Sequence, residues 1–194
     1  MTSLFGADLP DGFQYREDFI STSEEADVVE QIRHVTFSNF EMRGVIAKRR
    51  VAFFGLGYDE TQTIAETIPE FLWPYRDRAA EWAGVPAAAF VMALINEYTA
   101  GAPIGWHRDA PQYGIVAGIS LISSCRMKFR PYVSPTAQKR SADRQPRRTT
   151  HELMLMPRSA YLITGDARQR FEHSIPAVDT LRYSITFRTL RKRT

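Results

Sequence analysis

The chain has 194 residues and a formal net charge of +3, and its 44% hydrophobic and 24% charged content is ordinary for one globular domain with a real core. No apolar run is long enough to cross a membrane, and the first residues lack the basic and apolar segments of a secretory signal. The lone Cys125 excludes an internal disulfide framework and a cysteine-based zinc site, so we expect a protein of the reducing cytoplasm.

Two helices are expected in the first half of the chain. Residues 23–34 open with a serine typical of a helix N-cap and with acidic residues, and apolar residues follow at helical spacing: Ala26, Val29, Ile32 and Val35. A second helix is expected over residues 69–83, with an apolar face of Phe71, Leu72, Tyr75, Ala79 and Trp82. Because proline lacks an amide N–H, Pro74 must lie in the first turn of that helix or end it.

The second half of the chain has the composition of strands. We expect them at residues 90–98, 113–122, 126–133, 151–156, 160–164 and 182–189. Two helices followed by about eight strands predict an α+β, mostly β fold, either a β-sandwich or a jelly roll with the helices against one face.

Residues 134–150 join two of these strands and are rich in Pro, Ser, Thr and Arg, which predicts a long, mobile hairpin loop. Basic side chains crowd this loop and the C-terminus, as Lys139, Arg140, Arg144, Arg147 and Arg148, and as Arg188, Arg191, Lys192 and Arg193. Such clusters favour a polyanionic partner, and a solvated loop and terminus are the alternative.

A His-x-Asp pair, His107 and Asp109, is followed by a further imidazole at His173. On a strand, residues two apart point to the same face, so the pair could bind one metal with a third ligand from a distant strand. Two histidines and one carboxylate form the facial triad of non-haem Fe(II) oxygenases. Alone the pattern is weak, because a surface histidine beside an aspartate is common.

The segment 182–188 strengthens this interpretation. Arg182, Ser184, Thr186 and Arg188 alternate with apolar or aromatic residues, so they share one face of a strand. Two arginines on one face of a half-buried strand are costly unless anions pair with them. A dicarboxylate ligand would do so, and exposure at a sheet edge is the alternative.

The sequence here resembles the AlkB family of Fe(II)/2-oxoglutarate dioxygenases. The matching segments are LINEY (94–98), HRD (107–109), GDARQRFEH (165–173) and RYSITFR (182–188). The resemblance implies one domain over residues 1–194 with a double-stranded β-helix core at 90–190. It also implies an N-terminal extension at 1–48, a substrate-covering segment at 49–65 and a basic loop at 134–150.

The resemblance also implies roles for single residues. His107, Asp109 and His173 would bind Fe(II), and the co-substrates would be 2-oxoglutarate and O2. Residues implied to hold 2-oxoglutarate are Asn96, Tyr98, Arg182, Ser184, Thr186 and Arg188. Residues implied to contact the substrate are Arg50, Phe54, Tyr58 and Gln112, where an aromatic ring could stack on a base or, for Phe53 and Phe54, simply belong to a strand core.

The implied activity is oxidative dealkylation of N-alkylated nucleobases in DNA, with release of an aldehyde, succinate and CO2. Arg144, Arg147 and Arg148 would contact the nucleic acid, and we expect a monomer without a membrane partner. The run 109–113 lacks the acidic residue that DNA-repair members place after the triad aspartate, and GDAR (165–168) is similar to members that act on tRNA. An RNA-modifying dioxygenase, or a protein-directed or non-catalytic member, is therefore the alternative.

Overall fold

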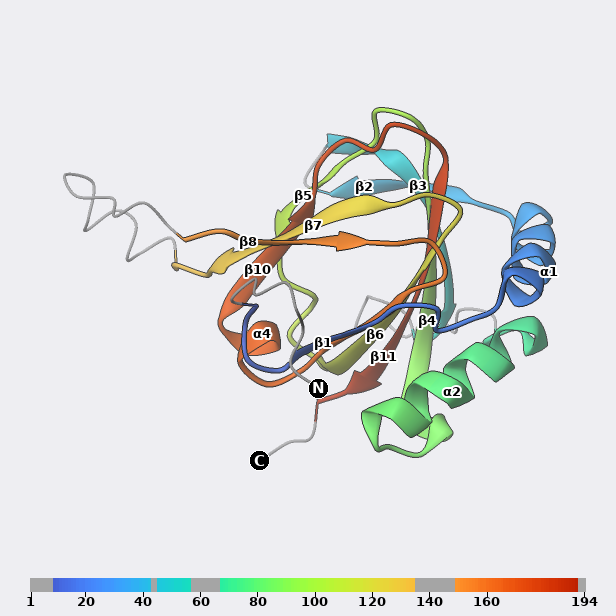
Figure 1. The fold of residues 1–194 in the computed structure, drawn as a ribbon, viewed down its shortest axis with the longest axis horizontal. Coiled ribbons are helices and arrows are strands. Elements are labelled where there is room, and N and C mark those ends of the chain that lie inside the picture. The colour runs from blue at the N-terminus through green and yellow to red at the C-terminus, as the bar shows by residue number, and fades with distance from the viewer. Residues whose placement is uncertain (1–8, 43–44, 57–66, 135–148, 192–194) are drawn as a thin grey trace.

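A computed structural model of the chain describes residues 9–42, 45–56, 67–134 and 149–191. These residues form two antiparallel sheets that face each other, with two helices against the outer face of the larger sheet (Figure 1). The arrangement is the expected jelly roll: a mostly β core with helices on one side only. No described helix has the length and apolar character needed to cross a membrane.

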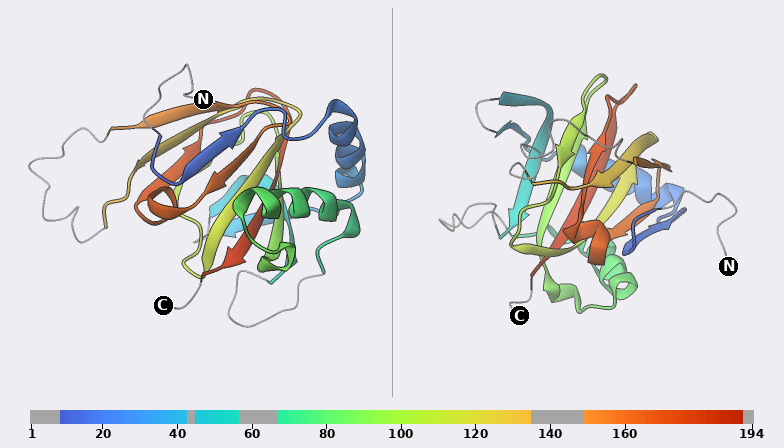
Figure 2. Two further views of the ribbon diagram at one scale, coloured as in Figure 1. Left: turned by 60° about the horizontal axis from the view of Figure 1, so that its bottom comes forward. Right: turned by 90° about the vertical axis from the view of Figure 1, so that its left-hand side faces the viewer.

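The larger sheet has seven strands in the order β1-β9-β6-β11-β4-β3-β2. Their bounds are β1 (Phe13–Arg16), β2 (Ser38–Met42), β3 (Val45–Gly55), β4 (Phe90–Tyr98), β6 (Tyr113–Leu121), β9 (Ala160–Ile163) and β11 (Arg182–Leu190). Strands β11 and β4 run side by side through the middle of this sheet (Figure 2), in a register that pairs Ser184 with Asn96.

The smaller sheet has four strands in the order β5-β10-β7-β8. Their bounds are β5 (Ile104–His107), β7 (Cys125–Pro131), β8 (His151–Leu155) and β10 (Phe171–Ile175). Strands β7 and β8 pair as the expected hairpin, although most of the segment that joins them, 135–148, lies outside the described residues. Buried side chains from both sheets, including Met127, Phe129 and Ile163, fill the space between them.

Helices α1 (Thr22–Arg33) and α2 (Trp73–Ala83) cover the outer face of the larger sheet. Short helical segments are η1 (Glu70–Leu72), η2 (Ala87–Ala89) and α4 (Gly165–Gln169). As expected, Pro74 lies in the first turn of α2. Strands β1, β2, β5 and β10 are not predicted from the sequence, because four or five residues give too few alternations to recognise. Strand β3 is not predicted either, because the sequence of residues 49–65 is interpreted as a substrate-covering segment.

The N-terminus of α1 corrects the expected position of its cap. The helix begins after Ser21, whose hydroxyl accepts a hydrogen bond from the Glu24 amide at 3.2 Å, and the Glu24 carboxylate accepts one from the Ser21 amide at 2.7 Å. This reciprocal capping box requires a serine three residues before the glutamate. Ser21 satisfies that spacing and Ser23 does not.

Alternation along the strands divides the larger sheet into two faces. On β11, Tyr183, Ile185 and Phe187 pack with the helices in one hydrophobic core. The intervening residues from Ser184 to Arg188 point to the other face, into a cavity between the two sheets. The helices therefore pack against the outer face of the sheet, while its inner face carries the polar residues.

Candidate active site

A cavity of about 320 Å³ lies between the two sheets. Its size is at the lower end of the range usual for small-molecule sites. Strands β3, β4, β5, β10 and β11 all contribute to its wall, which includes Asn96, His107, Asp109, His173 and Arg188. The candidate ligands from distant parts of the sequence are thus brought to one place.

His107 and His173 face each other across strands β5 and β10. They are direct partners in the β5–β10 register, and their ring centroids lie 4.3 Å apart. The Nδ1 atom of His107 donates to the Gly105 carbonyl at 2.9 Å. This bond fixes the tautomer and leaves Nε2 with a lone pair for a metal.

Asp109 is buried and is held by Arg188. Its Oδ1 atom accepts a hydrogen bond from Nε of Arg188 at 2.8 Å and lies 2.7 Å from Nη2 of the same arginine in an ion pair. The other oxygen, Oδ2, lies 3.7 Å from Nε2 of His173. One carboxylate oxygen is therefore used by the arginine, and the other remains beside the imidazoles.

The protonation states of these three side chains suit a metal. Burial lowers the pKa of both imidazoles, that of His173 to about 3, so both rings are neutral near pH 7. Burial alone would raise the pKa of the Asp109 carboxyl, but Arg188 and then the two histidines hold that pKa well below its usual range. Neutral imidazoles and an ionised carboxylate are the forms that bind a metal.

The three side chains do not yet form a closed ligand cage. Within the described part of the chain, no three His, Cys, Asp or Glu side chains converge closely enough to make a preformed metal site. Binding of Fe(II) therefore requires a small adjustment of these side chains. The donor set itself, two imidazoles and one carboxylate without a thiolate, fits non-haem Fe(II).

The floor of the cavity is formed by β4 and β11. Asn96 Nδ2 donates to Ser184 Oγ at 3.4 Å, and Thr186 Oγ1 donates to the Leu94 carbonyl at 3.3 Å. Tyr98 completes the polar floor, so with Arg188 five of the six residues implied to hold 2-oxoglutarate line this cavity together.

Arg182 lies behind the cavity wall, is fully buried and does not line the cavity directly. Its Nε donates to Ser120 Oγ at 3.1 Å, and its guanidinium carbon lies 5.0 Å from the ring centroid of Tyr98. Nη1 and Nη2 have no hydrogen-bond partner among the described residues. A buried cation with two unused donors is costly on its own, and the remote carboxylate of 2-oxoglutarate fits this need.

A scan against family models matches residues 12–188 to the 2OG-Fe(II) oxygenase superfamily. The chain belongs to this superfamily. Members of this superfamily use Fe(II), 2-oxoglutarate and O2, and the chain is similar in sequence and fold to AlkB-type proteins. Arg182 with its two unused donors, and the set of His107, Asp109 and His173, are consistent with these cofactors.

Comparisons with a relative and with solved structures show which proteins this oxygenase is similar to. It is 25% identical over 196 residues to the alkylated DNA repair protein ALKBH8 homolog of Arabidopsis thaliana, a match that covers 90% of the chain but only about half (54%) of that relative. The structure of OsALKBH1 superposes with a TM-score of 0.68 at 13% identity, covering 93% of this chain and 99% of that one. A Pseudomonas putida prolyl-4-hydroxylase superposes with a TM-score of 0.62 at 12% identity, covering 94% of both chains. At such low identities, the structural likeness shows the shared fold.

Strand β3 corrects two of the expected substrate contacts in this oxygenase. Arg49 and Phe53 line the cavity, whereas Phe54 is buried in the core under the helices. Arg50 likewise points away and bonds Glu97 at 2.5 Å. Because the strand period is two, a shift of one residue exchanges the faces, and the residues that face the cavity are one place away from those predicted.

The other expected substrate contacts are only partly described. Gln112 is exposed and lines neither the cavity nor the neighbouring groove. Four further residues lie outside the described residues, namely Tyr58, Arg144, Arg147 and Arg148. Their roles remain predictions from the sequence.

The enzyme also has site residues that sequence reasoning did not assign. Arg168 on α4 donates from Nη2 to the carbonyls of Ala110 and Tyr113, at 2.7 and 2.8 Å, and from Nε to that of Gly114 at 3.1 Å. It thereby ties down the loop that follows Asp109. The sequence pointed to Arg168 only through the segment 165–173, in which it lies five residues before the expected metal ligand His173.

Proposed function

We propose that this oxygenase oxidatively dealkylates N-alkylated nucleobases in DNA, and that the released products are an aldehyde, succinate and CO2. The observation that carries the proposal is a groove of about 1100 Å³ beside the cavity. His107 and Asp109 line both hollows, so a base inserted from the groove would reach the metal ligands. The printed name of the Arabidopsis relative, an alkylated DNA repair protein, also supports this activity.

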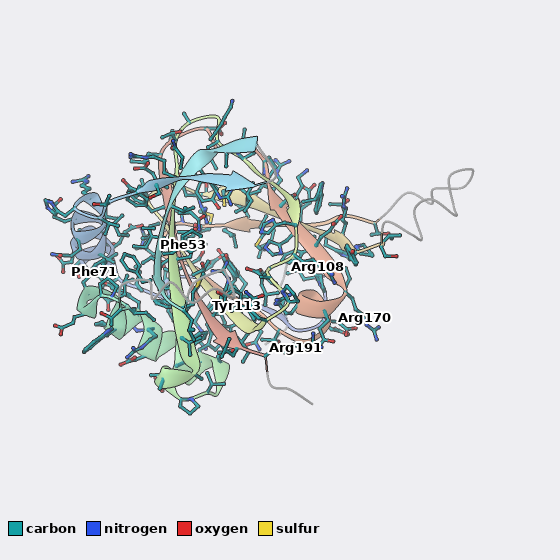
Figure 3. The ribbon with its side chains drawn as sticks, turned by 180° about the vertical axis from the view of Figure 1, so that it is seen from behind. Phe53, Phe71, Arg108, Tyr113, Arg170 and Arg191 are labelled. Carbon is teal, nitrogen blue, oxygen red and sulfur yellow. The ribbon has the colours of Figure 1, made fainter. Side chains whose placement is uncertain are left out.

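The rim of the groove has the charge and the aromatic surface that a nucleic acid strand requires. Arg108 stacks on Tyr132, with its guanidinium carbon 3.7 Å from the ring centroid. Arg191 is exposed at the other end of the groove, after strand β11. Both arginines lie on the side away from α1 (Figure 3), where phosphate groups could be bound.

The side chains of the site have separate roles in the proposed reaction. When bound, iron, 2-oxoglutarate and O2 supply the oxidation that converts an N-alkyl C–H bond to a C–OH group. His107, Asp109 and His173 hold the metal, while Arg188 orients Asp109. The resulting hemiaminal of the base then loses an aldehyde and restores the N–H group. No general base is required from these ligands.

The charge of the cavity favours a neutral base. Among the described residues that line it, Asp109 alone is acidic, and its carboxylate is already paired with Arg188. Arg49 and Arg108 add positive charge to the wall. A cationic base such as 3-methylcytosine therefore lacks an acidic partner in the cavity. Neutral 3-methylthymine carries no positive charge and needs no such partner.

The matched pair of 3-methylthymine and 3-methylcytosine tests the proposal directly. Each base is placed once in the same single-stranded oligonucleotide, and formaldehyde is measured with Fe(II), 2-oxoglutarate and O2. We expect turnover of both, with the neutral base at least several-fold faster. Absence of formaldehyde from every methylated or etheno-modified DNA would reject the DNA activity.

RNA is the second candidate substrate. The lack of an acidic residue in 110–113 and the GDAR segment at 165–168 favour it. The test compares one modified base in DNA and RNA strands of the same sequence. Faster turnover in RNA would indicate that RNA is the substrate. Absence of turnover in both strands would favour a protein-directed or non-catalytic member of the superfamily.

A further inference from the structure

Tyr161 lines the same cavity but is not among the residues expected to bind the metal, 2-oxoglutarate or substrate. It lies on β9, and its side chain is buried with 6% exposure. Its partners in the sheet are Gly118 on β6 and Tyr15 on β1. The ring therefore enters the cavity from the strand next to β6, opposite the β3 side.

Gly118 makes room for this ring. A Cβ atom at position 118 would lie 2.1 Å from Cζ of Tyr161 and 2.4 Å from its hydroxyl oxygen, both impossible contacts. The Tyr161 side chain thus crosses directly over the backbone of β6, toward β11, where Thr186 is the partner of Gly118. Only glycine at position 118 permits this path.

The Tyr161 hydroxyl has an unused donor in a charged environment. Among the described residues it has no hydrogen-bond partner. Arg182 lies nearby, because its Nε donates to Ser120 Oγ, and Ser120 is two residues from Gly118 on the same face of β6. Burial raises the pKa of this phenol, so the hydroxyl keeps its proton and can donate. The hydroxyl over Gly118 is therefore directed to the Arg182 end of the cavity.

We propose that the Tyr161 hydroxyl donates a hydrogen bond to the 2-oxoglutarate carboxylate that is remote from the metal, beside Arg182. The carboxylate would then meet two kinds of donor, the Nη atoms of Arg182 and the phenol. The two Nη atoms of Arg182 have no partner among the described residues, and the anion would accept from them and from the phenol together. The inference concerns the co-substrate and holds whichever base is dealkylated.

The test is 2-oxoglutarate binding to the Fe(II)-loaded protein without O2, measured by titration calorimetry. Tyr161→Phe removes the hydroxyl and keeps the ring over Gly118. We expect about tenfold weaker 2-oxoglutarate binding, since a hydrogen bond to a charged group is lost. The analogue 2-oxopentanoate has a methyl group in place of the remote carboxylate, and its affinity should be unchanged by the substitution.

Tyr15→Phe is the matched control. Tyr15 is the β1 partner of Tyr161, and its hydroxyl accepts a bond from the Met156 amide at 3.0 Å, outside the cavity. This variant should bind 2-oxoglutarate as the wild type does. Wild-type affinity in Tyr161→Phe would overturn the proposal, and so would an equal loss for 2-oxoglutarate and 2-oxopentanoate.

Gly118→Ala provides a second test that keeps the hydroxyl. The added methyl group must displace the Tyr161 ring, so 2-oxoglutarate binding should weaken at least as much as in Tyr161→Phe. A thermal melt checks that the variant is folded. A folded Gly118→Ala protein with wild-type affinity would contradict the assigned position of the hydroxyl.

Discussion

Arg188 holds one oxygen of Asp109 at two points, with a hydrogen bond from Nε at 2.8 Å and an ion-pair contact from Nη2 at 2.7 Å. Both residues are almost fully buried, and a third donor of Arg188, Nη1, reaches Thr186 Oγ1 at 3.0 Å. The arginine is thereby fixed at the cavity floor and holds the carboxylate with Oδ2 toward His173. Arg188 is a positioning residue for the metal ligand.

Replacement of Arg188 by lysine should weaken Fe(II) binding. Lysine keeps the positive charge but cannot form the two-point contact, so Asp109 would lose its fixed orientation. We expect a loss of Fe(II) affinity of about ten- to a hundredfold, as is usual when a residue that supports a metal ligand is changed. Calorimetry with Fe(II) under anaerobic conditions measures it. Unchanged affinity would mean that Asp109 is oriented without Arg188.

Arg168→Ala should loosen the loop after Asp109. The side chain bonds four backbone carbonyls between residues 109 and 114, so its loss leaves those groups without their donor. We expect lower Fe(II) affinity and lower kcat, with the KM for 2-oxoglutarate nearly unchanged. Arg170→Ala is the control, because Arg170 is exposed on the same segment and pairs only weakly with Asp166 at 3.4 Å. Equal effects of the two variants would argue against a role for the clamp.

The groove predicts where nucleic acid binds. Neutralising Arg108 and Arg191 together, as glutamines, should weaken DNA binding and reduce the slope of log affinity against log salt by about 1.4 for a single strand. The control neutralises Arg33 and Arg76, on α1 and α2, which lie away from the groove. A slope that falls equally in both double variants would place the binding surface elsewhere.

The acid stability of the enzyme should depend on Glu24. Its hydrogen bond to Arg78, followed by that from the Ser21 amide, lowers the pKa of this carboxyl from 4.5 to about 2. The unfolded chain therefore takes up the proton at higher pH than the folded chain. The stabilisation is complete above pH 4.5 and is lost as the pH falls toward 2.

Urea unfolding of Glu24→Gln between pH 2 and 6 measures this contribution. The variant should be less stable than the wild type near pH 6, and the difference should shrink as the pH falls. Glu30→Gln, exposed on the same helix, serves as the surface control. A constant difference between Glu24→Gln and wild type at all pH values would contradict the assignment.

The strand period explains which parts of the site the sequence could predict. The alternation along 182–188 places one set of side chains on one face, and in the structure Ser184, Thr186 and Arg188 of that set line the cavity. The same rule could not decide between Phe53 and Phe54, because both are aromatic and either face of β3 could look inward. Position in the register, rather than residue type, decides that choice.

Contacts between strands far apart in the sequence could not be predicted. Tyr161 and Gly118 are neighbours only because β9 pairs with β6, and a glycine within a strand signals a close approach without naming the partner. Likewise, the unused donors of Arg182 become evident only when its burial and its single bond to Ser120 are known. The capping pair Ser21 and Glu24, in contrast, has a recognisable spacing in the sequence, although we expected the cap at Ser23.

The most direct test of the central claim, dealkylation of a nucleobase by the His107, Asp109 and His173 site, is the ratio of formaldehyde to succinate. The substrate is a single-stranded DNA oligonucleotide with one 3-methylthymine, and Asp109→Ala is the matched inactive variant. We predict near-equal amounts of both products from the wild type and neither from Asp109→Ala. Succinate without formaldehyde for every modified strand, or wild-type product levels from Asp109→Ala, would contradict the account.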